Sequence, residues 1–409
     1  MTGRVFTDNS KKEPFSVKMR AYFIGFCYDS VNSLLKLISN LLWPKKVPLS
    51  PKNICIYRIG NIGDIICSIP AFIAIRKAYP YSKITLLTSP GGYGRPGAKE
   101  LLESATFMDK LWVYYADEVS SLKSAYNFSQ RMRAESFDLL IYLPQQLIML
   151  KYLFRNFIFL KLCGAKKTVG FELSTIKLWA SEQSKIYQFD NEVDRLINLL
   201  KRCGIPVSGG INYDLPVPND KKESALKIIE KYKIKSKLIF GIMPSASYED
   251  NQWSLDNFVE VIKFLLKNYK GCQIVIFGGH GDVEKGKYIK TKVKSVAVIN
   301  LCGITSLLET EFIIKKLNLL ISNNTGLMHM AALEGIKVLA VFSPAELNGN
   351  WLPYGQNSKV FINRNVPGCD GYYYRKLPKF EKCVTAINVV DPKEICLEIF
   401  NLIGKKMPQ

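Results

Sequence analysis

Short apolar runs alternate along the chain with longer segments in which apolar residues recur at helical spacing. Runs such as Ile54–Tyr57 are typical of buried strands, and segments such as 255–268 are typical of amphipathic helices. Because strands and helices alternate in both halves, the pattern predicts two doubly wound α/β domains with parallel sheets. The expected strands are 54–57, 84–87, 110–114, 139–143, 164–171, 238–243, 273–277, 297–301, 319–322 and 337–342. The expected helices are 64–77, 99–104, 147–162, 193–203, 221–232, 255–268, 283–292, 307–317, 324–334 and 392–403.

Residues 204–220 are rich in proline and glycine and have little periodicity, which favours a boundary between domains. We therefore expect an N-terminal amphipathic helical extension at 1–52, a first domain at 53–215 and a second domain at 216–390. The C-terminal helix at 391–409 could belong to the second domain or return to the first.

The segment 15–43 is apolar and aromatic with a cationic rim, which predicts one helix or a helix pair. Its basic residues are Lys18, Arg20, Lys36, Lys45 and Lys46. The simpler interpretation is a helix packed on the first domain or on another subunit. The alternative is a helix lying on an anionic membrane face. No stretch reaches the roughly 18 to 20 apolar residues of a membrane span, and the charged opening argues against a signal peptide.

Composition narrows the class of protein. The 409 residues are 48% apolar, which is enough for two cores, and the formal net charge is +21. The lysines are spread along the chain without an arginine-rich block, so nucleic acid ranks below a membrane surface or an anionic substrate as the partner. Ten cysteines without a C-x-x-C pair, together with two histidines, argue against a zinc ribbon. Free cytosolic thiols are expected, and pairing or metal sharing by Cys369 and Cys383 stays open.

The stretch 54–80 organises the first domain as a strand, a tight turn at 60–63 and a helix. Asp64 follows Gly63 at or beside the helix N-cap, at the carboxyl edge of the sheet, where ligands of α/β proteins bind. It is a candidate catalytic base, with a purely capping carboxylate as the alternative. The glycine-rich loop 89–97 lacks the lysine of a P-loop. Arg95 in that loop is a candidate acceptor contact, and a plain surface loop is equally compatible.

Three strand ends of the second domain carry small polar or acidic residues that should meet at one edge of the sheet. These polar or acidic residues are Ser245, Ser247, Asp282, Asn324 and Thr325. The helix beginning at Gly326 offers free N–H groups to a diphosphate, and His329 lies within reach of the same group. Asp282 suits a ribose diol. Each residue alone is an ordinary helix cap, and the convergence is what indicates a donor site.

These blocks resemble those of glycosyltransferase family 9, the bacterial heptosyltransferases. RIGNIGDIICSIPAFIAIRKAYP resembles the family's N-terminal signature, and NNTGLMHMAALEGIKVLAVF its donor signature, D-T-G-x-x-H-x-A-A. MPSASYEDNQWSLDNFVEVI is similar to its motif of hydroxyl residues followed by Lys-(Arg/His)-Trp-Pro. FGGHGD and GAKKTVGFE resemble two further segments. The resemblance covers about 53–353 and leaves the N-terminal helix outside.

The resemblance implies a GT-B fold, in which two Rossmann-like domains face each other across a cleft. It also implies an inverting transfer of heptose or a related sugar from a nucleotide-activated donor, with ADP-heptose as a candidate. The implied acceptor is an anionic glycan or glycolipid of the lipopolysaccharide-core kind. No metal and no cofactor are implied. The implied location is the cytoplasm, with peripheral contact at the cytoplasmic face of the inner membrane.

The resemblance also implies roles for single residues. Asp64 would be the general base, and Ser245 and Ser247 would hold the donor phosphate. Asp282 would bind the ribose. Thr325, Gly326 and His329 would bind the diphosphate.

Three positions depart from the family pattern: Asn324 stands for the usual aspartate, Asn251 for the motif lysine and Ser254 for the proline. Both asparagines are candidate donor-binding residues, and their charge changes leave a different donor or weak activity open. A non-catalytic nucleotide-sugar-binding protein is therefore the alternative function. A nicotinamide oxidoreductase is less compatible, because Gly60 and Gly63 do not form the G-x-G-x-x-G motif.

Overall fold

The computed structural model describes residues 14–90, 97–146, 150–172, 188–344, 346, 349–363 and 385–403. The chain forms two compact units, the first made of 1–216 with 347–350 and the second of 217–346 with 351–409. Arg95, Cys369 and Cys383 lie outside the described residues. The eight cysteines inside them are free thiols.

The first unit is built on a five-stranded parallel sheet in the order β3-β2-β1-β4-β5. Its strands are β1 (Asn53–Tyr57), β2 (Lys83–Thr88), β3 (Lys110–Val113), β4 (Leu139–Tyr142) and β5 (Lys167–Val169). In register, Ile54 lies between Ile84 and Leu139. Since the chain leaves β1 toward β2 and later returns beside β1 as β4, the strand order reverses between β1 and β4. Ligands of open α/β sheets bind at such a switch point.

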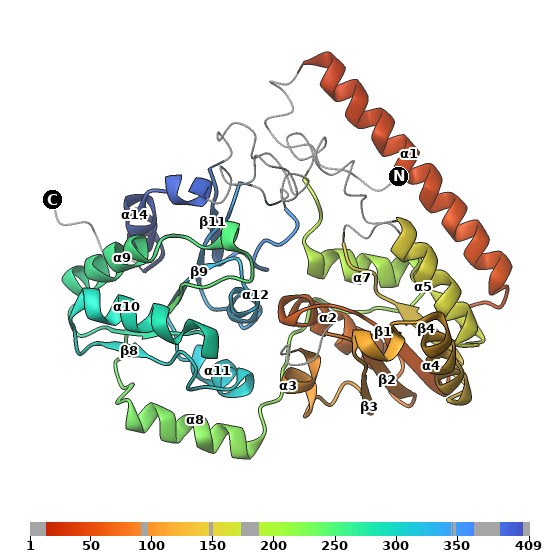
Figure 1. Ribbon diagram of the computed structural model, residues 1–409, viewed down its shortest axis with the longest axis horizontal. Coiled ribbons are helices and arrows are strands. Elements are labelled where there is room, and N and C mark those ends of the chain that lie inside the picture. Colours follow the sequence, from red (N-terminus) through yellow and green to blue (C-terminus); the bar gives the residue numbers. More distant parts are fainter. Residues whose placement is uncertain are drawn as a thin grey trace. The chain divides into compact units, whose positions relative to one another are not determined.

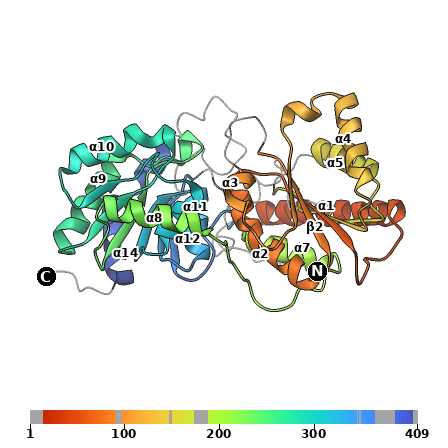
Figure 2. The same cartoon turned by 90° about the horizontal axis from the view of Figure 1, so that it is seen from below.

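Helices cover both faces of this sheet (Figures 1 and 2). They are α2 (Ile62–Ala78), α3 (Ala98–Leu102), α4 (Leu122–Ala134), α5 (Leu150–Leu162) and α7 (Glu192–Arg202), with a short 3-10 turn η2 (Ala116–Val119). Helix α2 packs with α3 and α7 on one face, and α4 packs with α5 on the other. Helix α4 is absent from the sequence-based expectation, because only Phe128, Ser129 and Met132 of its 13 residues are buried.

The N-terminal segment is one uninterrupted 28-residue helix, α1 (Phe15–Leu42), rather than a helix pair. Trp43, directly after it, is 2% exposed and packs its ring against Phe157 and Phe171. Val31 and Leu35 pack on the same core. The C-terminal part of this helix therefore packs on the first unit, which is one of the two arrangements in the simpler interpretation. In the described part of the chain, no helix combines the length and apolarity that crossing a bilayer requires.

The second unit repeats the design with six parallel strands in the order β11-β10-β9-β6-β7-β8. They are β6 (Ile239–Met243), β7 (Gln273–Ile276), β8 (Val298–Asn300), β9 (Leu319–Asn323), β10 (Val338–Val341) and β11 (Ser358–Phe361). The order reverses between β6 and β9, so the residues after these two strands lie at the switch point. Strand β11 is not among the expected strands, because its short Ser358–Phe361 run carries a lysine and only Phe361 is buried.

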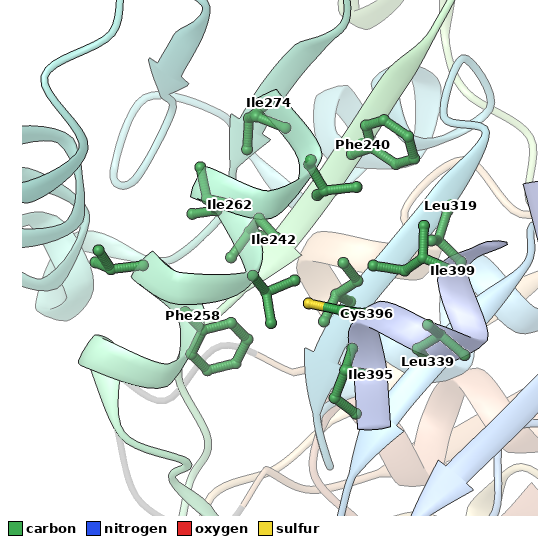
Figure 3. Packing of buried hydrophobic residues seen from close by; sticks show 14 of the residues in the cluster. Phe240, Ile242, Phe258, Ile262, Ile274, Leu319, Leu339, Ile395, Cys396 and Ile399 are labelled. Atoms are coloured by element: carbon green, nitrogen blue, oxygen red, sulfur yellow. The ribbon is translucent and has the colours of Figure 1, made fainter. Parts of the chain in front are cut away.

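The helices of this unit are α8 (Asn219–Lys231), α9 (Leu255–Asn268), α10 (Val283–Val293), α11 (Leu307–Ile314), α12 (Gly326–Leu333) and α14 (Pro392–Ile403). Three short 3-10 turns accompany them, η3 (Glu249–Asn251), η4 (His280–Asp282) and η7 (Ile387–Val389). Figure 3 shows the core between α9, α14 and the sheet, where Phe258 and Ile262 face Ile395 and Ile399. Helix α14 therefore belongs to the second unit, which corrects the arrangement in which it returns to the first domain.

Candidate active site

Asp64 occupies the third position of α2, directly after the turn that follows β1. Its Oδ2 accepts the backbone N–H of Asn61 at 2.9 Å, which completes a capping box at the start of the helix. Gly60 leaves room for this carboxylate, since a Cβ on Gly60 would lie 2.3 Å from the Asp64 Cβ. The N-cap is Asn61, so Asp64 lies three residues beyond it, in the first turn of the helix, rather than at or beside the cap as expected, and its side chain remains 12% exposed. Gly63, half-buried, is the second residue of α2.

A buried ionic network lies behind Asp64. Arg58, fully buried, places Nη2 at 2.8 Å from Glu192 Oε1 and 3.5 Å from Asp64 Oδ1. Arg195 closes the network by donating to both carboxylate oxygens of Glu192, each at 2.7 Å. Both guanidinium groups also donate to the carbonyl of Pro144, which follows β4 at the switch point. The network therefore joins the ends of β1 and β4 to the first turns of α7.

This arrangement shifts the two carboxylates in opposite directions. Burial raises the pKa of Asp64, the negative charge of Glu192 adds to the rise, and Arg58 opposes it. Burial also pushes the pKa of Glu192 upward, but Arg195 and Arg58 outweigh it and hold that pKa below its usual value. Glu192 therefore carries the stable negative charge, and Asp64 is the carboxylate that takes up a proton more readily. Such a split is typical of acid–base sites.

At the switch point of the second unit, Ser245 and Asp282 lie in direct contact. The Ser245 hydroxyl donates to Asp282 Oδ1 at 2.5 Å. Lys285 Nζ lies 3.3 Å from each of these two oxygens and donates to Gln252 Oε1 at 3.0 Å. Asp282 Oδ2 accepts the N–H of Gly279 at 3.0 Å, in the same turn geometry that Asp64 adopts. The structure thus brings together Ser245 and Asp282, as expected, and adds a lysine.

The end of β9 and the start of α12 form the second part of this region. Thr325 is the N-cap of α12, and its Oγ1 accepts the N–H of Met328 at 3.3 Å. Asn324, Thr325 and Gly326 are half-buried. His329 is 4% exposed and its ring meets that of Trp351 edge-on at 5.9 Å. These residues occupy the helix N-terminus that the sequence predicts.

Two candidate residues have a different setting. Asn251 is 3% exposed and donates to Glu346 Oε1 at 2.9 Å, so its side chain is buried in a contact inside the unit. The Oδ1 of Asn251 has no hydrogen-bond partner among the described residues, and donor binding by Asn251 stays a prediction. Ser247 is exposed. The neighbouring Trp253 is a core residue, 1% exposed, whose indole N–H donates to the Val390 carbonyl.

Sequence reasoning missed four residues of these clusters: Arg58, Glu192, Arg195 and Lys285. A charged residue directly after a buried strand is a usable signal for Arg58. The i, i+3 pair of opposite charges signals Glu192 and Arg195, but the 134 residues between Arg58 and Glu192 hide the network. Within the described residues, no group of three or more His, Cys, Asp or Glu side chains is arranged to hold a metal ion.

Curated relatives of the chain are heptosyltransferases. It is 21% identical over 298 residues to the lipopolysaccharide core heptosyltransferase OpsX of Haemophilus influenzae, covering 72% of this chain and 80% of that enzyme. It is 29% identical over 111 residues to lipopolysaccharide heptosyltransferase 2 of Salmonella typhimurium, covering 26% of this chain. That match spans 31% of the Salmonella enzyme.

Solved structures share the fold. A family 9 glycosyltransferase from Veillonella parvula superposes with a TM-score of 0.67 at 18% identity, over 88% of this chain and all of the other. The ADP-heptose lipopolysaccharide heptosyltransferase II of E. coli gives a TM-score of 0.60 at 17% identity, over 86% of this chain and 98% of the other. The two doubly wound parallel sheets match the GT-B class of these structures.

The sequence blocks and both switch points therefore agree with a single family. A sequence model of that family matches residues 125–371, which is more than half of the chain and includes the whole Ser245–Asp282 region and the start of α12. The chain belongs to glycosyltransferase family 9, the heptosyltransferase family.

Proposed function

We propose that this chain transfers a sugar from a nucleotide-activated donor to a glycan acceptor, with inversion and with Asp64 as the general base. The observation that carries the proposal is Asp64 itself: a carboxylate of raised pKa, still 12% exposed, at the switch point of the first unit. Family membership supports the same reaction class.

In the proposed step, the acceptor hydroxyl gives its proton to the Asp64 carboxylate. The acceptor oxygen then forms a bond to the anomeric carbon on the face opposite the donor diphosphate. The bond between that carbon and the diphosphate oxygen breaks, and the nucleoside diphosphate leaves with the electron pair. A base whose pKa lies closer to neutral than that of an ordinary aspartate takes this proton more effectively.

The leaving diphosphate is stabilised by the second unit. The N–H groups at the start of α12 and the dipole of that helix favour an anion. Thr325 and His329 stand at this helix and are the proposed diphosphate contacts. Asp282 accepts the ribose hydroxyls, and Ser245 contacts a phosphate oxygen. We propose no metal and no cofactor in this step, because helix N–H groups and cationic side chains supply the stabilisation.

Lys285 supplies the positive charge that a lysine at position 251 supplies in the family motif. Asn251 lacks that charge, yet the adjacent Gln252 is hydrogen-bonded to Lys285, whose ammonium group also contacts Ser245 and Asp282. A cation therefore stands at the strand ends of β6 and β7 without a lysine in the motif. We propose that Lys285 contacts the donor diphosphate.

Replacing Lys285 should weaken the donor complex. Lys285→Met should reduce the affinity for ADP by about 10- to 100-fold, as expected for the loss of a charge-assisted hydrogen bond. Lys287→Met is the matched control, because Lys287 lies on the same helix and pairs only at the surface with Glu284. Titration calorimetry with ADP gives both values. Equal affinity in the two variants would remove Lys285 from the donor site.

The proposed donor class is a nucleoside diphosphate sugar, with ADP-heptose first because the E. coli structural relative is an ADP-heptose enzyme. A thermal-shift panel of ADP-, UDP- and GDP-sugars, followed by turnover with a lipopolysaccharide-core fragment, tests this. A donor that raises Tm and is consumed supports the transferase. Stabilisation without consumption by any acceptor would favour the non-catalytic sugar-nucleotide binder that Asn324 and Asn251 suggest. The proposed setting is the cytoplasm, where such donors are made, at the face of the inner membrane.

A further inference from the structure

The outer face of α1 carries exposed apolar side chains in two groups, at 15–26 and at 34–41, with Ser30 and Ser33 between them. Helical spacing places these side chains within a sector of about 160°, and each is exposed to solvent. They are Phe15, Met19, Tyr22, Phe23, Phe26, Leu34, Leu37, Ile38 and Leu41. Large contiguous apolar surfaces on a protein mark sites of interaction with another surface.

The side opposite the outer face is fixed to the first unit in the C-terminal part of α1, so the exposure of the outer face there is a feature of the fold. Leu35 and Leu42 pack on the core around Trp43. Lys161 of α5 donates to the Leu42 carbonyl at 2.6 Å, and Lys167 of β5 donates to the Trp43 carbonyl at 2.8 Å. Figure 1 shows α1 as one rod whose C-terminal end meets α5.

Three serines lie within the outer face, at 16, 30 and 33, and the hydroxyls of Ser30 and Ser33 are bonded to the helix itself. Ser30 donates to the Phe26 carbonyl and Ser33 to the Asp29 carbonyl, each at 2.9 Å. A hydroxyl already bonded to the backbone loses little when water is removed. The outer face can therefore enter an apolar phase without leaving these donors unsatisfied.

The charge around this face is positive. Between residues 14 and 52 the chain carries six basic residues and one acidic residue. Lys36, Lys45 and Lys46 are exposed. On α5, Phe154 and Ile158 are exposed together with the basic Lys151 and Arg155, which repeats the pattern beside the end of α1. An apolar helix face with a cationic rim fits the surface of an anionic bilayer.

We propose that α1 lies on the surface of an anionic lipid membrane, with its outer face at the boundary between headgroups and acyl chains. A second copy of the chain is a weaker fit, because a two-fold contact through this face would bring the same cationic rim against itself. The inference concerns α1 alone and does not rest on the proposed transferase function.

Vesicle flotation of the full-length protein tests the proposal. Vesicles of phosphatidylethanolamine and phosphatidylglycerol should bind the protein, and vesicles of phosphatidylcholine should bind it at least about tenfold less. Binding should fall with added salt, because the attraction is screened over about 8 Å at physiological ionic strength. The variant F23S/F26S/L37S should lower binding to the anionic vesicles by about tenfold or more.

The matched control is L226S/V296S/L397S, which removes three exposed apolar side chains from the second unit and should leave vesicle binding unchanged. These substitutions are preferable to deleting residues 1–46, since the deletion removes the buried Trp43. Turnover of a lipid-free acceptor fragment should be unchanged in F23S/F26S/L37S. The proposal is overturned if the wild type binds no anionic vesicle at low salt, or if the α1 variant and the control bind equally. It is also overturned if the α1 variant only splits a dimer.

Discussion

Asp64→Asn should lower kcat/KM for sugar transfer by about 100-fold or more, while ADP affinity stays within about twofold. Asparagine keeps an oxygen that can accept the Asn61 N–H, so the capping box and the turn remain. What the variant loses is the ability to take a proton from the acceptor hydroxyl. The proposed donor contacts lie on the second unit and are untouched by the substitution.

The pH profile separates a base from a structural carboxylate. Because burial and Glu192 raise the pKa of Asp64, the acidic limb of kcat/KM should lie above the value of about 3.9 that is usual for aspartate. Activity should rise as pH increases through this limb, since the base works in its ionised form. The limb should disappear from the residual activity of Asp64→Asn.

Asp138→Asn is the control for this variant. Asp138 also accepts backbone N–H groups, those of Lys52 and Asn53, but it stands at the opposite end of β1. Its removal should leave turnover within a few-fold of the wild type. If Asp64→Asn gives the same result as Asp138→Asn in a folded protein, the carboxylate is a helix cap and the proposed mechanism fails.

Most strands could be predicted from the sequence, because parallel strands that are buried on both faces are continuous apolar runs. Ten of the eleven strands of the described residues were expected from the sequence, and β5 (Lys167–Val169) is the one of these that is not an apolar run. Strand β11 was not predicted, since Lys359 interrupts a four-residue run. Helix α4 was not predicted for a related reason: it buries few side chains, so its apolar residues show only a weak helical period.

The candidate site was predictable where a residue's position along its element decides its role. Asp64, Thr325 and Asp282 all follow strand ends and begin helices, and local spacing is enough to place them. Roles that depend on partners distant in sequence were not accessible. The contact of Asn251 with Glu346, 95 positions away, is one such case. The proposed role of Lys285 depends on its position beside Ser245, 40 positions away.

Glu192→Gln should cost about 3 to 5 kcal/mol of the free energy of unfolding at neutral pH, the range for breaking a buried ion pair. Glu192 is 1% exposed and is the shared partner of Arg58 and Arg195, which are 0% and 6% exposed. The isosteric amide leaves no cavity but provides one acceptor oxygen for two buried guanidinium groups. Glu172→Gln is the matched control, because Glu172 pairs with Arg202 at the surface and should cost less than about 1 kcal/mol.

The effect on stability should depend on pH in a fixed direction. Since the pKa of Glu192 is lowered in the folded protein, its contribution is present above the unfolded value of about 4.3 and is lost as pH falls through the folded pKa. The difference between wild type and Glu192→Gln in urea unfolding should therefore be full at neutral pH and shrink under acid conditions.

Glu192→Gln should also move the acidic limb of activity to lower pH. The charge of Glu192 is one cause of the raised pKa of Asp64, and its loss leaves Arg58 with Asp64 as its remaining carboxylate partner among the described contacts. Both changes favour the ionised form of Asp64. A purely structural role for Glu192 would lower stability and leave the limb in place. An unmoved limb, measured at a temperature where the variant is folded, would therefore separate the ionic network from the chemistry of Asp64.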